Sequence, residues 1–445
     1  MKFGGTSVED GAAFERVAQI VRSYDRASPV VVVSAMSGVT DALVTSLLAA
    51  AKGEPITAES YLERHLERHL HVISGLGSRA QSRMRMLVED TRREILDLLR
   101  VAAASGIATG EQRDMISSHG ERLSANLLAL ILEEHNLPAT YVDARRCLLT
   151  DEEHGNARPM IRETQRQTRA TLGPLLEAKR VPVLGGFIGA TRNGVTTTLG
   201  RGSSDYSATL ISAALGAIET QIWTDVDGVG TADPGLVESA RTVSQLTYEE
   251  AAELARLGAR VLHPQMFQPV VEPGIPVRIC NSRARERRGT VICAAPETTP
   301  GVVKAIAHKT NLTQMDITST PAFVANGFLR AIREIFELHK TQLDIVGMSP
   351  VGASLTLTET EALPLILQDL RQVGAVQTKG SRAIVSCIGA GLQAEPESAR
   401  NVLSGLQRID PTLIWQSTTS LNLIAIVDAD SVGSVVRRLH QGLFE

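Results

Sequence analysis

The sequence has few cysteines and no long apolar run. Its four cysteines are far apart and form no C-x-x-C pair, which argues against a disulfide framework and a cysteine-based zinc site. No apolar stretch approaches the roughly 20 residues of a membrane span. The N-terminus shows no basic segment followed by an apolar one, as a signal peptide would. We therefore expect a protein of the reducing cytoplasm without a membrane partner.

Aromatic residues and excess positive charge are also scarce. Aromatics make up 3% of the residues, so the core has to be built from Leu, Val, Ile and Ala. The formal net charge is −4 and no basic stripe stands out, which argues against nucleic acid as a partner. With 445 residues, of which 43% are hydrophobic, the chain is long enough for two or three domains.

No group of side chains predicts a metal held by the protein alone. His65 and His69 share a face of a predicted helix, but charged residues surround them, so a solvated helix face is the preferred interpretation. Asp225 and Asp227 lie in a loop that lacks the EF-hand spacing and its closing glutamate. A loop at the edge of a sheet, near a nucleotide and its magnesium, fits these two aspartates better.

A glycine-rich turn, Gly200–Ala208, is the stretch around which the other motifs are organised. It follows the β-rich run 195–199 and precedes an apolar helix over 207–215. Such a turn presents backbone N–H groups and the positive end of a helix dipole, which suit an anionic ligand. Arg201 adds a planar fork that can grip a carboxylate or a phosphate. Asp205 could cap the helix or orient a neighbouring cation, and a plain capped turn is the alternative for this stretch alone.

Two further turns of this kind precede predicted helices, although almost nothing precedes Lys2 to form the strand that should lead into the first of them. Lys2 precedes two glycines and two hydroxyl residues and then a helix over 10–24, so its ammonium and the glycine N–H groups suit a phosphate. The β-branched run 30–33 leads into the polar segment Ser34–Asp41. Because open α/β folds bind ligands where the carboxyl ends of parallel strands meet, we expect the three turns to converge on one edge of a sheet.

Further strands and helices fill the rest of the N-terminal part. Residues 57–135 are helix-rich, and within them Glu121 and Arg122 follow a glycine. This pair is either solvated or lines a pocket, and the sequence alone favours the solvated pair. Strands are also predicted over 140–142, 181–188, 220–224 and 275–279, and helices over 159–179 and 247–257.

The C-terminal third contains a weak internal repeat. A charged and then proline-rich segment, 283–300, predicts a linker between domains. After it, residues 308–380 and 381–445 each read strand–helix–strand–strand–helix, which is the ferredoxin-like order. The second repeat lacks a closing strand of its own, and we infer that the β-like run 302–307 completes it.

Taken together, the motifs resemble the aspartate kinase family, over nearly the whole chain. The ending 439–445 looks closest to its monofunctional, lysine-sensitive branch. The resemblance implies an α/β amino acid kinase fold, a mainly parallel sheet sandwiched by helices, over 1–282, and two ACT units over 301–445. Each motif is weak alone, but six in the family's order are specific: Lys2–Ser7, Val33–Thr40, Gly120–Arg122, Gly200–Ala208, Trp223–Gly228 and Val261–Pro264.

The resemblance also implies a reaction, with ATP and Mg²⁺ as cofactors and L-aspartate as the phosphoryl acceptor. Two anions must be held in line, so such catalysis is mostly positioning and charge neutralisation. Lys2 would stabilise charge on the transferred phosphoryl group, oriented by Asp205. Arg201 would grip a substrate carboxylate, and Glu121 the amino group. The other implied contacts are substrate hydrogen bonds at Ser34, Thr40, Gly202, Ser203 and Ser204, phosphate contacts at Phe3, Gly4 and Gly5, and a nucleotide border of Thr224, Asp225, Gly230, Gly235, Arg260 and Val261.

The sequence departs from the family pattern mainly on the nucleotide side. Arg260 stands where a lysine is usual, which keeps the charge and changes its geometry. Gly230 and Gly235 replace side chains that often touch the nucleotide, and Ser203 stands where glycine is frequent. These departures bear on ATP affinity more than on the type of reaction.

The ACT-like repeats imply regulation and assembly. Such units bind small amino acids at interfaces between paired domains, and the resemblance favours lysine as effector, with threonine left open. It places Asp344, Met348 and Ser349 near the expected pocket, although these residues could equally only end a strand. Because paired ACT sheets normally associate across subunits, a homodimer or larger homo-oligomer is expected.

Two other functions stay open. One is another amino acid kinase, acting on glutamate or carbamate. The Glu121 motif and the C-terminal repeat argue against this alternative. The other is a non-catalytic amino-acid sensor that kept the fold and lost turnover, which the nucleotide-side departures support.

Overall fold

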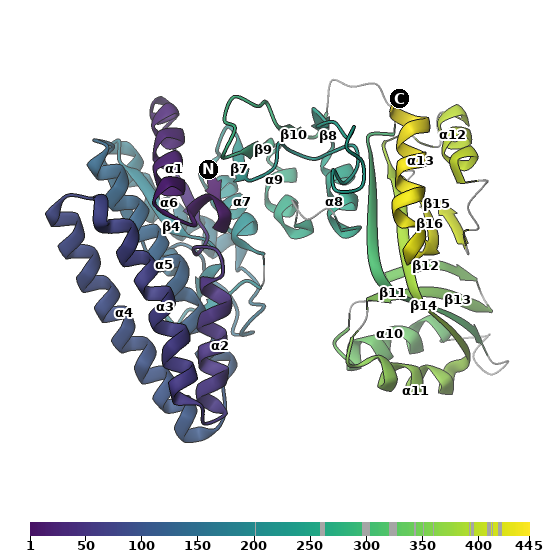
Figure 1. Ribbon diagram of the computed structural model, residues 1–445, viewed down its shortest axis with the longest axis horizontal. Helices are drawn as coiled ribbons and strands as arrows, with labels where there is room; N and C mark the ends of the chain where they lie inside the picture. Colours follow the sequence, from purple (N-terminus) through teal and green to yellow (C-terminus); the bar gives the residue numbers. More distant parts are fainter. Residues whose placement is uncertain are drawn as a thin grey trace. The chain divides into compact units, whose positions relative to one another are not determined.

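The computed structural model describes residues 1–200, 202–258, 263–295, 303–319, 327–341, 344–349, 351–358, 360–390, 392, 396–406, 411, 413–416 and 421–445. The chain forms two compact units (Figure 1). The first comprises Met1–Val229, Ser244–Tyr248 and Val261–Pro296, and the second comprises Gly230–Val243, Glu249–Arg260 and Glu297–Glu445. Two segments that precede residue 282 therefore belong to the C-terminal unit.

The first unit contains a sheet of eight strands in the order β3-β4-β2-β1-β7-β9-β10-β8. All neighbours are parallel except β9 and β10, which run antiparallel. Strands β5 and β6 form a separate two-stranded antiparallel sheet. The strands are β1 (Lys2–Phe3), β2 (Val31–Val33), β3 (Ala139–Val142), β4 (Val181–Gly185), β5 (Ile188–Ala190), β6 (Thr196–Thr198), β7 (Thr220–Thr224), β8 (Gln245–Leu246), β9 (Val277–Asn281) and β10 (Thr290–Ile292).

Helices cover both faces of this sheet. Helix α5 packs against β2, β3 and β4, while α6 and α7 pack against each other and against β4, β2, β1 and β7. Strands buried on both faces have to be apolar throughout, and all three valines of β2 are buried, as are all five residues of β4. The helices are α1 (Gly11–Ser23), α2 (Val39–Ala51), α3 (Pro55–Val72), α4 (Ser78–Ser105), α5 (Gly110–Glu134), α6 (Ile161–Glu177), α7 (Ser204–Leu215) and α9 (Gln268–Val271). Helix α8 (Tyr248–Arg256) belongs to the second unit from Glu249 onward.

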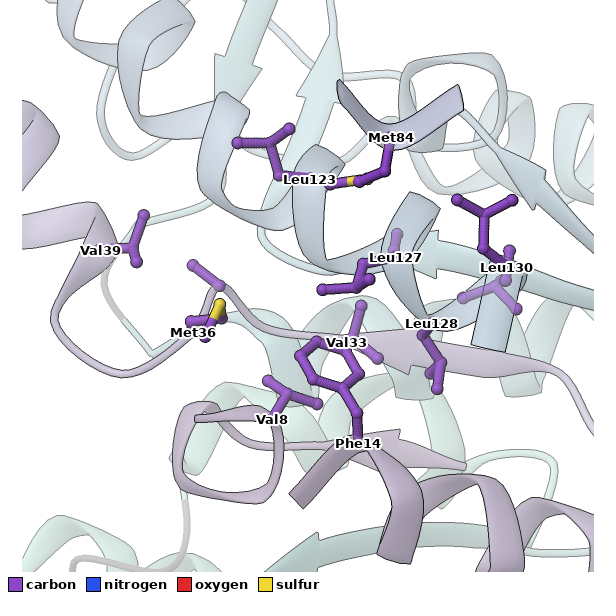
Figure 2. Packing of buried hydrophobic residues seen from close by; sticks show 14 of the residues in the cluster. Val8, Phe14, Val33, Met36, Val39, Met84, Leu123, Leu127, Leu128 and Leu130 are labelled. Atoms are coloured by element: carbon purple, nitrogen blue, oxygen red, sulfur yellow. The ribbon is translucent and has the colours of Figure 1, made fainter. Parts of the chain in front are cut away.

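Helix α5 is fixed firmly at its start and along its buried side. Thr109 and Gln112 form a capping box, in which Gln112 Oε1 accepts the Thr109 N–H at 2.9 Å and Thr109 Oγ1 accepts the Gln112 N–H at 3.2 Å. Leu127 and Leu128 pack in the aliphatic core with Phe14 of α1, as Figure 2 shows. Truncating one such leucine to alanine typically costs about 2–5 kcal/mol of stability. A helix anchored in this way can hold a functional side chain in place.

The second unit contains an antiparallel sheet in the order β12-β13-β11-β14-β16-β15. Helices α10 and α11 cover one apolar cluster, and α12 and α13 belong to another. The strands are β11 (Ala305–Ser319), β12 (Asp344–Ser349), β13 (Gly352–Thr358), β14 (Gly374–Ile388), β15 (Leu413–Gln416) and β16 (Asn422–Asp428). The helices are α10 (Phe328–Leu338), α11 (Leu363–Val373), α12 (Pro396–Leu406) and α13 (Val432–Phe444).

Two long strands, β11 and β14, join the two halves of this sheet. Each is 15 residues long. Residues 305–309 of β11 pair with 384–388 of β14, and after a register shift residues 312–319 pair with 374–382. Ala305–Ala307, from the run expected to close the second repeat, thus pair with β14 in that half, while Val302 lies outside the described residues.

The boundary between the units differs from chain order. Ala232 and Val237 are buried in an apolar cluster with residues of β14, β16 and α13. Glu250 of α8 is fully buried, and its Oε2 lies 3.0 Å from the Lys304 ammonium. Thr290–Ile292, from the segment predicted as a linker, forms β10 and pairs with β9. Burial and strand pairing over long separations decide these positions, and local composition does not report them.

Among the helices of the described residues, none has both the length and the apolar character that crossing a membrane requires.

Candidate active site

The strand ends that carry the predicted turns lie at one edge of the first unit's sheet. Phe3 at the end of β1 is in register with Val33 of β2 and with Trp223 of β7, and Val33 is in register with Gly185 of β4. Backbone hydrogen bonds continue past the strand ends, since the Ser34 N–H donates to the Phe3 carbonyl at 3.1 Å. The turns after these strands therefore open on the same side of the sheet.

Lys2 and Asp205 form an ion pair at this edge. The Lys2 Nζ lies 2.7 Å from Asp205 Oδ1, and both side chains are 12% exposed. Asp205 is the second residue of α7, and the residue before this helix, Ser203, makes no side-chain cap bond. Of the two roles left open for Asp205, orienting a cation is the one present here. A partly desolvated ion pair of this kind holds an ammonium in a fixed position.

Glu121 is a buried carboxylate on α5, 4% exposed. Burial raises the pKa of Glu121 from 4.5 to about 8, although hydrogen bonds from its own backbone N–H, the Ala35 backbone and the Thr40 side chain oppose the shift. Its Oε2 has no hydrogen-bond partner among the described residues. The solvated pair that the sequence favoured is thus wrong for Glu121, because helix packing buries it, whereas Arg122 bonds to the Nδ1 of His119 at 3.2 Å.

Two glycines allow the elements of the site to approach closely. A Cβ on Gly185, at the end of β4, would lie 2.9 Å from the Cβ of Glu121. A Cβ on the next residue, Gly186, would lie 2.7 Å from the Cβ of Ser204 at the start of α7. Any side chain at these two positions would push α5 or α7 away from the sheet edge.

A cleft of about 880 Å³ opens between these turns and helices, entirely within the first unit. Glu121 of α5 and the start of α7 line it. Such a volume accommodates a small-molecule ligand. The predicted site residues that line it are Gly5, Ser34, Thr40, Glu121, Gly202 and Ser204.

Several cleft residues were not predicted from the sequence, namely Arg113, Asp114, Ser117, Phe187 and Thr198. Asp114 and Ser117 precede Glu121 by seven and four residues, so the helical repeat could have placed them on its face. Phe187 follows Gly185, the last residue of β4, and Gly186, and it has φ +68°, an unusual conformation for a residue with a side chain. His263 also lies near the turn, because a Cβ on Gly202 would be 3.4 Å from its ring, and burial lowers the pKa of His263.

Some predicted site residues have their polar groups engaged elsewhere. The Gly4 N–H donates to the Trp223 carbonyl at 3.2 Å, so it is not free to bind a phosphate as predicted. The Ser203 hydroxyl donates to the Gly200 carbonyl at 2.5 Å. Phe3 is buried and stacks on Trp223, with ring centroids 6.0 Å apart. These three residues therefore stabilise the structure of the turns through contacts inside the protein.

The residues expected to border a nucleotide are spread over both units. Thr224 and Asp225 follow β7 at the sheet edge of the first unit, and the Thr224 hydroxyl donates to Asp225 Oδ1 at 3.2 Å. Gly230 and Gly235 belong to the second unit, where a Cβ on Gly230 would lie 2.6 Å from the Ala232 carbonyl oxygen. Arg201, Arg260 and Val261 lie outside the described residues.

The residues expected near an effector lie on β12 in the second unit. The Ser349 hydroxyl donates to the Gly352 carbonyl at 3.2 Å, at the turn from β12 to β13. For Asp344 and Met348 the structure describes the backbone. Among the described residues, no group of three or more His, Cys, Asp or Glu side chains is placed to hold a metal ion.

Comparison with known proteins agrees with this architecture. Residues 1–281 match the amino acid kinase family. Over 456 aligned residues the chain is 33% identical to the lysine-sensitive aspartokinase 3 of Escherichia coli (strain K12), covering 100% of this chain and 98% of that protein. The crystal structure of E. coli aspartokinase III with aspartate and ADP, in the R-state, superimposes with a TM-score of 0.88 at 33% identity, covering 100% of this chain and 99% of that one. The same enzyme with lysine and aspartate, in the T-state, gives a TM-score of 0.82 at the same identity and coverage.

Proposed function

Because the chain belongs to the aspartokinases of the amino acid kinase family, we propose that it transfers the γ-phosphoryl group of MgATP to the side-chain carboxylate of L-aspartate, forming 4-phospho-L-aspartate. The observation that carries this proposal is the Lys2–Asp205 ion pair at 2.7 Å, at the same sheet edge as a cleft that holds the buried, half-unpartnered Glu121. The site thus offers an ammonium for the phosphoryl group and a buried carboxyl group for the amino group of the other reactant.

The reaction needs positioning and charge neutralisation more than covalent chemistry. The attacking carboxylate and the triphosphate are both anionic, so they repel each other until cations screen them. The Lys2 ammonium would stabilise the negative charge on the transferred phosphoryl group. Asp205 would hold this ammonium in place. Removing a single preorganised donor of this kind typically lowers kcat by about 10²–10³.

Glu121 would bind the amino group of aspartate. An ammonium that enters the cleft supplies the partner that the Glu121 Oε2 lacks, and the pair forms where water is scarce. Arg201 would grip a carboxylate of the same substrate, and Ser34, Thr40 and Ser204 would donate hydrogen bonds. Ser34, Thr40 and Ser204 line the cleft together with Glu121, which supports their assignment.

ATP would approach from the side of the sheet edge formed after β7. Thr224 and Asp225 lie there, and Gly230, Gly235, Arg260 and Val261 are the further nucleotide residues that we propose. Mg²⁺ takes few protein ligands and binds mainly to phosphate oxygens, so it would arrive with the nucleotide. The four cysteines are free thiols, which supports a reducing, cytoplasmic setting.

We also propose feedback regulation at the second unit. Two ferredoxin-like halves joined by β11 and β14 support an amino-acid effector site, for which lysine is the first candidate because the E. coli relative is lysine-sensitive. Asp344, Met348 and Ser349 would lie near it, and a homodimer would form through these halves. Adding lysine or threonine to a kinase assay, together with sedimentation of the chain, tests both points.

A hydroxamate assay tests the reaction itself. Hydroxylamine traps an acyl phosphate, so the purified chain with MgATP should yield hydroxamate from aspartate and little from glutamate. Hydroxamate from glutamate alone would indicate another amino acid kinase. No hydroxamate from either substrate, with lysine binding retained, would indicate a sensor that has lost turnover.

A further inference from the structure

Asp114 is a buried carboxylate that lines the cleft, and the function proposed above gives it no role. It lies on α5 seven residues before Glu121, which places both side chains on one face of the helix, two turns apart. The Asp114 side chain is 2% exposed, yet it lines the same cleft as Glu121. A buried carboxylate is costly unless it is hydrogen-bonded, so its partners indicate what it is there to hold.

Asp114 binds two segments that are distant in sequence. Its Oδ1 accepts the Thr198 hydroxyl at 2.5 Å, and its Oδ2 lies 2.7 Å from His154 Nδ1. Both oxygens accept the Gly155 N–H at 3.1 Å. Hydrogen bonds to a carboxylate are among the stronger ones in proteins. One side chain of α5 therefore fastens the end of β6 and the loop around Gly155.

Both fastened segments support the turn that leads to α7. Thr198 is the last residue of β6 and stands two residues before Gly200. The Thr198 carbonyl accepts the Ala157 N–H at 2.9 Å, and a Cβ on Gly200 would lie 2.9 Å from Asn156 Oδ1. The loop over 154–157 therefore lies directly against the start of this turn.

We propose that Asp114 is a positioning residue of the aspartate pocket. Through Thr198 and the loop around Gly155 it sets the distance between Glu121 on α5 and the turn that begins at Gly200. The distance between the groups that bind the amino group and the carboxylate of one small substrate is then fixed. This inference rests on the proposed function for the identity of the substrate, and it requires no contact between Asp114 and that substrate.

The ATP side of the site is held by other contacts. The Gly4 N–H bonds to the Trp223 carbonyl, and the Ser7 hydroxyl donates to Ser282 Oγ at 2.9 Å. Weakening the Asp114 contacts should therefore raise the KM for aspartate more than the KM for ATP. A merely structural residue would instead lower thermal stability and change both Michaelis constants together.

The test compares Asp114→Asn, Thr198→Val and Thr198→Ser with Asp97→Asn, an exposed aspartate on α4 whose Oδ1 bonds to Arg100. Asp114→Asn and Thr198→Val should each raise KM for aspartate about tenfold, the size of one lost charge-assisted hydrogen bond, with KM for ATP within about twofold. Thr198→Ser, which keeps the hydroxyl, should restore KM, and the Asp114→Asn/Thr198→Val double variant should change it less than the two singles combined. Asp97→Asn should behave as wild type.

Equal changes in both Michaelis constants, or an unchanged KM for aspartate in both single variants, would overturn the inference. If Asp114→Asn does not fold, the Thr198→Val and Thr198→Ser pair decides. A wild-type chain without aspartate kinase activity would instead overturn the proposed function. In that case hydrogen exchange still tests the contacts, because Asp114→Asn should expose the Gly155 and Asn156 amides while α7 stays protected, and unchanged protection there would contradict them.

Discussion

Glu121 combines a functional position with a cost in stability. Its carboxyl group is buried, one of its oxygens lacks a partner, and burial raises its pKa to about 8. The residue type could be found from the sequence, because it stands in the segment Gly120–Arg122. Its burial could not, because the packing of α5 against β4 over Gly185 depends on residues more than sixty positions away.

The first prediction concerns the pH dependence of aspartate binding. Below about pH 8 the free Glu121 is mainly protonated and cannot pair with an ammonium. The kcat/KM for aspartate should therefore rise about tenfold per pH unit up to about pH 8 and then level off. Steady-state kinetics between pH 6 and 9 measure this. A flat profile in the wild type would contradict the role of Glu121.

The second prediction concerns the stability of Glu121→Gln. A carboxyl group whose pKa is higher in the folded state than in the unfolded state binds more protons when folded, so the free energy of unfolding falls as pH rises from about 4.5 to about 8. Glutamine removes this fall. Urea unfolding at pH 8.5 should show Glu121→Gln to be about 1–3 kcal/mol more stable than wild type, although its aspartate binding is lost. The exposed Glu67 on α3 provides the control, Glu67→Gln. A less stable Glu121→Gln would contradict the account.

At the scale of elements, regular strands and helices could be predicted closely, whereas α7 begins at Ser204, three residues earlier than expected. The strand 220–224 agrees with β7, and the helix expected over 159–179 occupies Ile161–Glu177. Local periodicity and glycine chemistry are enough for such elements. Phe187 was missed because its left-handed conformation depends on the β4–β5 turn and on the Ser207 hydroxyl, which accepts its N–H at 2.8 Å.

The third prediction tests a contact between two of the turns. The Arg68 guanidinium on α3 donates to the Ser37 carbonyl at 2.7 Å and to the Glu9 carbonyl at 3.1 Å. It therefore ties the turn after β2 to the turn after β1. Arg68→Gln should raise the KM for aspartate severalfold. The melting temperature should change little, because Arg68 is only half-buried. Steady-state kinetics beside Arg64→Gln, an exposed arginine of the same helix, measure the effect. Equal kinetics in the two variants would show that Arg68 does not order the turns.

At the scale of the whole molecule, the sequence predicts two parts and their fold classes. The comparison with E. coli aspartokinase III, at a TM-score of 0.88, confirms the predicted family and fold. The assignment of Gly230–Val243 and Glu249–Arg260 to the second unit could not be predicted. It depends on contacts such as Glu250 with Lys304, which are formed over 54 residues of chain.

The fourth prediction concerns that buried ion pair. Glu250 is fully buried and also accepts the Ala390 N–H at 2.6 Å, so losing the lysine removes an ion-pair partner from a buried carboxylate. Lys304→Ala should destabilise the second unit by about 3–5 kcal/mol in urea unfolding. Arg330→Ala, which breaks an exposed pair with Glu334 on α10, should cause no measurable change. A Lys304→Ala variant as stable as Arg330→Ala would show that Glu250 does not depend on the lysine.

The central claim is that Lys2, held by Asp205, stabilises the transferred phosphoryl group, and aspartate hydroxamate formation with MgATP tests it most directly. Lys2→Ala should lower kcat/KM for aspartate by about 10²–10³ relative to wild type, with its thermal unfolding transition intact. Lys2→Arg, which keeps the charge and changes its geometry, should recover part of the loss. A folded Lys2→Ala variant with near-wild-type turnover would contradict the account.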